Sequence, residues 1–236
     1  MKKIVFVTGT RADYGKLKSI ILNFQKKKNF KTIVFATGMH NLKIFGNTFK
    51  EIKKDKIKNV HRFFNQVYGN DMPTIMAKTV IGFNKLVKKI KPDLIVVHGD
   101  RLETLACASV GSFQNIKVAH IEGGEVSGTV DELIRHAVSK LSHVHMVTNL
   151  KAKKRLVQMG ENKNNIYIIG SPDIDIMTSK NLPKLSEVKK KYEIKYENYC
   201  MAIFHPVTTE LGNIKKQVNI FIEAMMKTKK NYILIY

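Results

Sequence analysis

Short apolar runs alternate along the chain with longer segments in which apolar positions recur every three or four residues. The longer period is that of a helix with one buried face, and a short continuous apolar run is typical of a strand buried on both faces. This alternation predicts an α/β fold, a doubly wound parallel sheet with helices on both faces. The expected strands are KIVFVTG, KTIVFAT, IKNVHRFF, DLIVVHGD, KVAHIE, HVHMVT and IYIIG, and the expected helices span about 14–28, 41–53, 74–90, 102–113, 131–141 and 150–159.

The alternation is interrupted after the last of these strands. Pro172, Pro183 and the charged helix SEVKKKYEI follow, and the pattern restarts with the strand YCMAIFHP, a helix over about 214–229 and the strand NYILIY. A strand–helix–strand piece of about 40 residues cannot build a sheet that is covered on both faces. We therefore expect an N-terminal Rossmann-like domain over 1–178, and a linker helix with the truncated start of a second Rossmann-like domain over 179–236. The chain is then interpreted as a fragment of a longer two-domain protein.

The composition is that of a globular protein, with 44% hydrophobic and 25% charged residues. No apolar run approaches the roughly 18 to 20 residues that a membrane-spanning helix needs, and the start MKKIVFVTG turns polar too soon for a signal peptide. Cys107 and Cys200 lie far apart and in no C-x-x-C pair, so neither a disulfide framework nor a thiolate zinc site is indicated. These features predict a cytoplasmic protein without a membrane partner.

A formal net charge of +22 raises the question of nucleic-acid binding, since cationic surfaces gain affinity for phosphates by releasing counterions. Only five of the 41 basic residues are arginine, however, and the lysines are spread along the chain. Surfaces that clamp phosphates and read bases favour arginine with interleaved aromatic residues, and neither is clustered here. A basic nucleic-acid-binding module is therefore the least favoured interpretation, and we expect no nucleic-acid partner.

The stretch TGTRADYGKL contains two glycines and a lysine, as a phosphate-binding loop does, but the residues between and after them differ from that motif. A P-loop needs four residues between its glycines and a Ser or Thr after its lysine, whereas five residues separate Gly9 from Gly15 and Leu17 follows Lys16. A loop between a strand and a helix can still bind an anion through backbone N–H groups and the helix dipole. Arg11 and Lys16 would add charge to such a site, or they are ordinary solvated cations; this stretch alone favours neither interpretation.

Polar residues directly follow several predicted strands. Ligands of open α/β sheets bind outside the carboxyl ends of the strands, which meet at one edge when the sheet is parallel. Taken singly, Asp100 and Asp131 could equally be helix caps, and Glu122 a solvated side chain. His98 and His120 are expected to pack inward in the sheet, and no residues have complete metal-ligand spacing, so no metal requirement is predicted. The polar residues at the strand ends are Thr10, Arg11, Asp13, His98, Asp100, Arg101, His120, Glu122, Glu125, Asp131, Glu132 and Arg135, with His205, Thr208, Thr209 and Glu210 in the second domain.

Five motifs occur along the chain in the order TGTRADYGKL, DLIVVHGDRLE, VAHIEGGEVSGTVDELIRHAVSKLSH, IIGSPDID and FHPVTTE. In order and spacing they resemble the UDP-N-acetylglucosamine 2-epimerases over the whole chain. GTRAD, HIEGGE and FHPVTTE favour the hydrolysing branch, which feeds sialic-acid-type sugar synthesis, over the non-hydrolysing branch with GTRPE, HVEAG and GHRRES. The resemblance implies a glycosyltransferase-B-like fold, of which this chain holds the N-terminal domain and the start of the C-terminal nucleotide-binding domain.

The reaction that this resemblance implies is elimination of UDP across C1 and C2 of the sugar, followed by addition of water to the glycal with inversion at C2. Such chemistry needs a base on one ring face, an acid on the other, and cations for the leaving pyrophosphate. By motif position, the family's catalytic residues match Asp100, Glu122, Asp131 and His205, its phosphate-side cations match Arg11 and Lys16, and Arg135 is a further substrate-binding candidate.

No cofactor is expected, and TGTRADYGKL is then an anion site for the pyrophosphate without magnesium chemistry. The implied partners are a UDP-sugar and, at full length, further copies of the same chain. The family binds uridine in the C-terminal half, which is absent here, so we expect a fragment that can fold without being active. The sugar stays open between UDP-N-acetylglucosamine and its 4-acetamido-6-deoxy derivative, and the nucleotide stays open too. A glycosyltransferase of the same fold, which would need an acceptor, is the alternative function.

Overall fold

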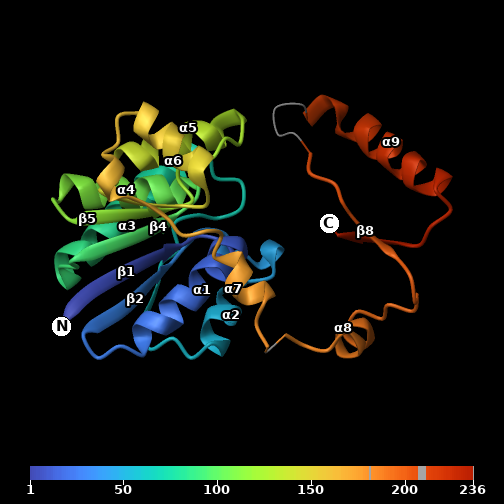
Figure 1. Ribbon diagram of the computed structural model, residues 1–236, viewed down its shortest axis with the longest axis horizontal. Coiled ribbons are helices and arrows are strands. Elements are labelled where there is room, and N and C mark those ends of the chain that lie inside the picture. The colour runs from blue at the N-terminus through green and yellow to red at the C-terminus, as the bar shows by residue number, and fades with distance from the viewer. Residues whose placement is uncertain (181, 207–210, 236) are drawn as a thin grey trace. The chain divides into compact units, whose positions relative to one another are not determined.

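The computed structural model describes residues 1–180, 182–206 and 211–235 of the chain. These residues belong to two compact units, Met1–Ser179 and Lys180–Tyr236. Figure 1 draws the first unit in blue through green and yellow to light orange at its end, and the second in deeper orange to red.

The first unit is built around a seven-stranded parallel sheet. Its strands are β1 (Lys2–Thr8), β2 (Phe30–Ala36), β3 (Val60–Arg62), β4 (Leu94–His98), β5 (Lys117–Ile121), β6 (Val144–Val147) and β7 (Ile166–Ile168). They lie in the order β3-β2-β1-β4-β5-β6-β7, and every neighbouring pair is parallel. From β1 the chain adds β2 and β3 on one side, and it then adds β4 to β7 on the other side of β1. Open α/β sheets bind ligands at the point where the strand order reverses in this way, here between β1 and β4. The doubly wound parallel sheet expected from the sequence is confirmed.

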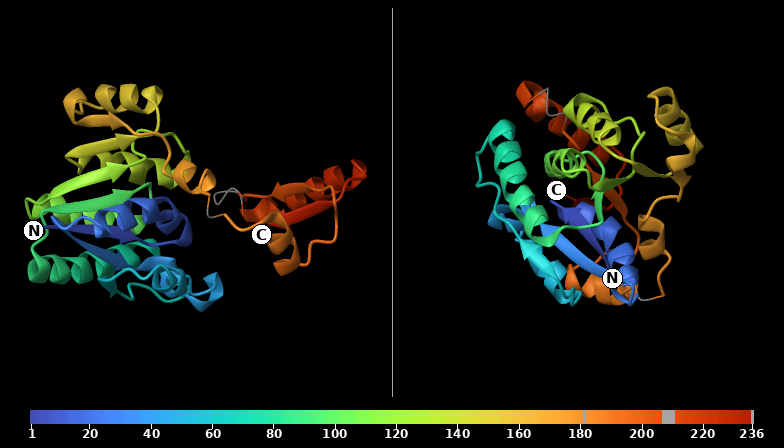
Figure 2. Two further views of the ribbon diagram at one scale, coloured as in Figure 1. Left: turned by 60° about the horizontal axis from the view of Figure 1, so that its bottom comes forward. Right: turned by 90° about the vertical axis from the view of Figure 1, so that its left-hand side faces the viewer.

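Helices cover both faces of this sheet (Figure 2). They are α1 (Arg11–Gln25), α2 (Phe49–Lys54), α3 (Met72–Ile90), α4 (Leu102–Phe113), α5 (Thr129–Lys140), α6 (Leu150–Gln158) and α7 (Asp173–Met177), with short 3₁₀ turns η1 (Gly38–Asn41), η2 (Lys43–Phe45) and η3 (Lys163–Asn165). Side chains of a strand alternate between the faces: Ile4 and Phe6 of β1 pack with α1 and α2, whereas Val5 and Val7 pack with α3, α4 and α5. The short helix α7 lies beside α1 (Figure 1).

Two elements begin or break at places that the periodicity alone did not show. Helix α1 starts at Arg11, three residues before the expected Tyr14, because Thr10 and Asp13 form a capping box in which each side chain accepts from the other's backbone N–H. The helix expected over about 41–53 is instead η1, η2 and α2, because Gly46 adopts a φ of 78°, the left-handed conformation that ends a helix. Helix α7 was not expected from the periodicity.

The second unit continues the alternation. It contains α8 (Leu185–Lys191), β8 (Cys200–Ile203), η4 (Leu211–Asn213), α9 (Ile214–Lys227) and β9 (Tyr232–Ile235). β8 and β9 pair in parallel with Cys200 beside Tyr232, and α9 makes the crossover that a parallel pair requires. In both units, no helix among the described residues is long and apolar enough to span a bilayer.

Candidate functional site

The carboxyl ends of the central strands of the first unit lie level with one another. His98, the last residue of β4, pairs in register with Ile121, the last residue of β5, and Ile121 pairs with Met146 of β6. β1 is the other neighbour of β4, and α1 begins shortly beyond its end. Residues that follow β1, β4 and β5 therefore meet at one edge of the sheet, beside the reversal in strand order.

Glu122, directly after β5, has a buried carboxylate with a partner on each oxygen. Oε2 lies 2.7 Å from Lys16 Nζ and 3.0 Å from His98 Nε2, and Oε1 accepts a hydrogen bond of 3.2 Å from Ser171 Oγ. The backbone of Glu122 is left-handed, with a φ of 61°, and its carbonyl accepts a 2.8 Å hydrogen bond from Arg135 Nη1. A residue other than glycine keeps this conformation only where its surroundings fix it, and such residues gather at functional sites.

Asp13, Lys16, His98 and Glu122 form what we name the strand-end cluster. Asp13 Oδ1 lies 3.7 Å from His98 Nδ1, too far for a hydrogen bond, so it acts on the ring through its charge. Burial raises the pKa of Glu122, but the hydrogen bonds and charges of His98 and Lys16 outweigh burial and lower it to about 2. Burial likewise lowers the pKa of His98, and the carboxylates of Asp13 and Glu122 reverse this and raise it. Glu122 is therefore held ionised in this arrangement.

Asp13 occupies part of the loop that the sequence indicates as an anion site. Its Oδ2 accepts hydrogen bonds from the N–H groups of Gly9 (3.2 Å) and Thr10 (3.0 Å). These amides at the start of α1 are thus already bound to a carboxylate of the chain itself. Arg11 is exposed and Lys16 is partly exposed. An anion that approaches this helix end would therefore meet the side chains of Arg11 and Lys16 before the amides of Gly9 and Thr10.

Asp100 and Arg135 form a second ion pair at the same edge. Arg135 Nη2 donates to Asp100 Oδ2 while Nη1 of the same group holds the carbonyl of Glu122. One buried guanidinium therefore links Asp100, after β4, to the backbone after β5. Asp131 lies one turn before Arg135 on α5 and on the same side of that helix, with an exposed side chain.

His205 belongs to the second unit, where it follows β8 and is exposed. Thr208, Thr209 and Glu210 of the same motif lie outside the described residues. The structure thus brings Lys16, Glu122, Asp100 and Arg135 together in the first unit, and the role of His205 stays a prediction.

Ser171 and Asp173 join this site although the sequence did not single them out, and His98 joins it although it was expected only to pack inward in the sheet. His98 is buried, as expected for an inward-packed residue, but its ring is bonded to Glu122. The alternation along β4 carries the signal, because His98 shares with Val96 the face that α1 covers. Ser171 and Asp173 follow β7 in the motif IIGSPDID, and Asp173 Oδ2 lies 3.5 Å from Lys16 Nζ.

His120 packs inward, as the sequence predicts. It is fully buried, with Nε2 2.8 Å from the carbonyl oxygen of Gly99 and Nδ1 3.1 Å from Ser139 Oγ. Burial lowers its pKa to about 3, so the ring is neutral. Its contacts join the loop after β4 to α5, which carries Arg135. Within the described part of the chain, no three His, Cys, Asp or Glu side chains are grouped as metal ligands.

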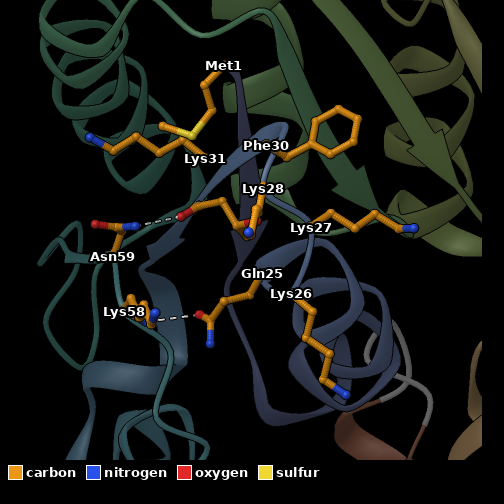
Figure 3. Close-up of a pocket in the computed structure, with 10 residues that line it drawn as sticks. Met1, Gln25, Lys26, Lys27, Lys28, Phe30, Lys31, Lys58 and Asn59 are labelled. Carbon is orange, nitrogen blue, oxygen red and sulfur yellow. Dashed lines mark hydrogen bonds between the residues drawn. The ribbon is translucent and has the colours of Figure 1, made fainter.

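A surface hollow with many lysines lies at the opposite end of the strands. It is lined by Met1, Gln25, Lys26, Lys27, Lys28, Phe30, Lys31, Thr32, Lys58 and Asn59. Figure 3 shows Lys26, Lys27 and Lys31 extending away from one another rather than converging on a common point. Because these lysines diverge, the hollow lacks the convergent polar groups of a ligand site. None of its lining residues belongs to the strand-end cluster.

The chain is similar to known proteins both in sequence and in fold. The family model described as UDP-N-acetylglucosamine 2-epimerase matches residues 22–236. A "UDP-N-acetylglucosamine 2-epimerase" of Neisseria meningitidis is 45% identical over 236 residues, 100% of this chain and 63% of that protein. A "UDP-N,N'-diacetylbacillosamine 2-epimerase (hydrolyzing)" of Legionella pneumophila is 36% identical over 233 residues, 97% of this chain and 62% of that protein. The chain spans less than two thirds of the length of these relatives.

The fold is shared with a crystal structure of UDP-GlcNAc 2-epimerase from Neisseria meningitidis bound to UDP-GlcNAc. The TM-score is 0.84 at 22% sequence identity, and the match covers 98% of this chain and 65% of that one. At this identity the likeness concerns the fold alone, and it confirms the glycosyltransferase-B-like class expected from the sequence.

Proposed function

Because the chain belongs to the UDP-N-acetylglucosamine 2-epimerase family, we propose that the whole protein is a hydrolysing UDP-sugar 2-epimerase. Its substrate is UDP-N-acetylglucosamine or the 4-acetamido-6-deoxy derivative, and its products are UDP and a free N-acetylmannosamine-type sugar. The observation that carries the proposal is the contact of Lys16 with Glu122 beside the Asp100–Arg135 pair. It joins proton-transfer groups and cations at the edge where open α/β sheets bind ligands.

The reaction has two parts. A base takes the proton from C2, the C–H electron pair forms a double bond between C1 and C2, and the C1–O bond breaks with its electron pair leaving on the β-phosphate of UDP. Water then adds to the glycal, with its hydroxyl on C1 and a proton delivered to C2 on the other ring face, which inverts C2. The sum consumes one water for each sugar released and requires no oxidant or reductant.

The residues of the site suit these steps. Asp100 and Glu122 are carboxylates able to accept and return protons, and Asp131 is a third candidate on α5. Negative charge grows on the leaving UDP as the C1–O bond breaks, so Arg11 and Lys16 stabilise the transition state more than the bound substrate.

Two observations support the hydrolysing reaction over simple epimerisation. The chain carries GTRAD, HIEGGE and FHPVTTE, the forms of these motifs that match the hydrolysing branch. The Legionella pneumophila relative, at 36% identity, is named as a hydrolysing enzyme. The same relative acts, by its name, on a diacetylated bacillosamine, which supports including the 4-acetamido-6-deoxy sugar among the substrates to be tested.

Incubating the whole protein with each UDP-sugar in D₂O, without an acceptor, tests the proposal. We expect UDP and free sugar in equal amounts by ¹H NMR, with the sugar in the manno configuration and one deuterium at C2. A UDP-linked epimer with no free UDP would contradict hydrolysis. Release of UDP only after an acceptor is added would identify a glycosyltransferase instead.

A further inference from the structure

Glu122, one of the carboxylates that the proposed reaction uses, is bound by three groups of the protein itself. Lys16 and His98 bind Oε2 of Glu122, and Ser171 binds Oε1. A carboxylate accepts a proton through an oxygen lone pair, and a carboxylate bound by cations is a weak base. Glu122 is therefore a weak base for as long as both Lys16 and His98 bind it.

Lys16 is the partner best able to leave. His98 is fixed within β4 and only 6% exposed, whereas the side chain of Lys16 is 27% exposed and carries its charge on a flexible four-carbon stem. Lys16 is also shared, because Asp173 Oδ2 lies 3.5 Å from its ammonium group. A second anion can thus attract Lys16 without any movement of the backbone.

The nucleotide sugar supplies such an anion. Lys16 lies in the second turn of α1, five residues after Arg11, which is exposed at the start of the same helix. Because the amides of Gly9 and Thr10 are bound to Asp13, these two side chains are the cations that this helix end offers to a diphosphate. The ammonium group already lies between the carboxylates of Glu122 and Asp173. A diphosphate carries more negative charge than either carboxylate, so it draws the ammonium group towards itself and weakens the 2.7 Å contact with Glu122.

We propose that Lys16 blocks Glu122 in the free protein and moves to the diphosphate of the nucleotide sugar, so that the substrate itself releases the carboxylate for proton transfer. The inference rests on the proposed function and adds a control to it. His98 and Ser171 keep Glu122 oriented after Lys16 has left. The base is thereby active only when a leaving group is in place.

When Lys16 leaves Glu122, the surroundings of the Glu122 carboxylate become less positive. Three groups contact the carboxylate of Glu122 directly: Lys16 from α1, His98 from β4, and Ser171 after β7. Arg135 from α5 binds the carbonyl oxygen of Glu122. Two further carboxylates lie behind these groups, since Asp13 of α1 faces His98 and Asp173 faces Lys16. Departure of Lys16 removes a positive charge, while burial continues to oppose ionisation. A neighbouring opposite charge lowers a carboxyl pKa by about 1–3 units. The pKa of Glu122 should therefore rise by about 1–3 units when a diphosphate binds.

Carbon-13 NMR of the glutamate side-chain carboxyls tests this without any turnover. The Glu122 signal is assigned by its loss in Glu122→Gln and titrated with acid, first without ligand and then with saturating inorganic pyrophosphate or UDP. In the unmodified protein either ligand should raise the pKa of Glu122. Lys16→Met should show a raised pKa without ligand, and ligand should then change it little. Lys18→Met is the matched control, since Lys18 lies on the same helix and pairs with Asp55 at 2.6 Å; it should behave as the unmodified protein.

The proposal is overturned if ligand leaves the pKa of Glu122 unchanged in the unmodified protein, if Lys16→Met has the unmodified pKa, or if neither ligand saturates. Its failure is separable from that of the proposed function. A ligand-induced rise in a protein that releases no sugar would support the role of Lys16 and contradict the epimerase. Sugar release without the rise would do the reverse.

Discussion

Asp100 and Glu122 differ in the cation that holds each carboxylate. Arg135 pairs with the side chain of Asp100 but only with the backbone of Glu122, whose side chain is held by Lys16 and His98. A guanidinium remains charged at any ordinary pH and binds in a fixed fork, whereas an ammonium group on a flexible stem exchanges partners. At the scale of single residues, Asp100 is therefore positioned by a permanent partner and Glu122 by a replaceable one.

Neutralising either carboxylate should stop the reaction. Asp100→Asn and Glu122→Gln, made separately in the whole protein, should each lower kcat by about 10²–10⁴-fold, because an amide keeps the shape of the side chain but cannot exchange a proton. Steady-state release of sugar, with UDP affinity measured beside it, checks this prediction, and UDP binding should persist in both variants. If both variants turn over at nearly the rate of the unmodified protein, Asp100 and Glu122 do not transfer protons and serve only as helix caps or ion-pair partners.

Glu122 should also contribute to stability in a defined pH range. Its pKa falls from the ordinary 4.5 to about 2 on folding, so its stabilising effect is present above about pH 4.5 and is lost as the pH falls towards 2. At about 1.4 kcal/mol for each unit, the loss is on the order of 3 kcal/mol.

Urea unfolding of the unmodified protein and of Glu122→Gln from pH 6 to 2 measures this contribution. The difference between their unfolding free energies should shrink as the pH falls through the window. Glu51→Gln, which removes an exposed carboxylate paired with Lys54, is the control and should show little change. A constant difference for Glu122→Gln would mean that Glu122 is not stabilised as an anion.

At the scale of helices and strands, the local sequence pattern predicts the bounds of some elements, whereas packing shifts the bounds of others. The expected helix 102–113 coincides with α4, because its apolar period is uninterrupted. The expected helix 41–53 breaks at Gly46, and α1 gains a turn from the Thr10–Asp13 capping box, which depends on where the loop places those side chains. Gly15 in α1 and Gly82 in α3 look alike in sequence, but their surroundings differ completely.

Alanine at these two glycines should have opposite effects. A Cβ at Gly82 would lie 2.0 Å from the ring of Phe63, whereas a Cβ at Gly15 meets nothing within 4 Å. Gly82→Ala should destabilise the protein by about 1–3 kcal/mol through overpacking, and Gly15→Ala should stabilise it by up to about 1 kcal/mol through helix propensity. Urea denaturation of both variants checks this, and equal stabilities would show that Phe63 yields without cost.

At the scale of the whole molecule, the predicted functional residues are divided between the two units. Arg11, Lys16, Asp100 and Glu122 belong to Met1–Ser179, and His205 belongs to Lys180–Tyr236. In the proposed reaction Arg11 binds the diphosphate in both the bound substrate and the transition state. We propose that His205 acts on the leaving UDP only as the C1–O bond breaks, so its loss should appear in turnover alone.

Two variants of the whole protein separate these roles. His205→Asn should bind UDP nearly normally and lower kcat, whereas Arg11→Ala should weaken UDP binding and lower kcat as well. Calorimetric UDP affinity and steady-state rates are the measurements. If turnover is unchanged in His205→Asn, His205 does not act in the bond-breaking step. If UDP affinity is unchanged in Arg11→Ala, Arg11 at the start of α1 does not bind the diphosphate.

Hydrophobic periodicity, a property of neighbours in the chain, was enough to determine the seven strands of the first unit, most of its helices, the parallel sheet and the polar residues at the strand ends. The motifs in those positions determined the family. Only the tertiary structure decided which of these polar residues meet. Lys16 and Glu122 lie 106 positions apart and are joined because β1 and β5 both flank β4. That order follows from packing whole strands and helices together, and a local pattern does not contain it. The same packing placed His98 against Glu122, bound the amides of Gly9 and Thr10 to Asp13, and left Lys16 partly exposed between Glu122 and Asp173.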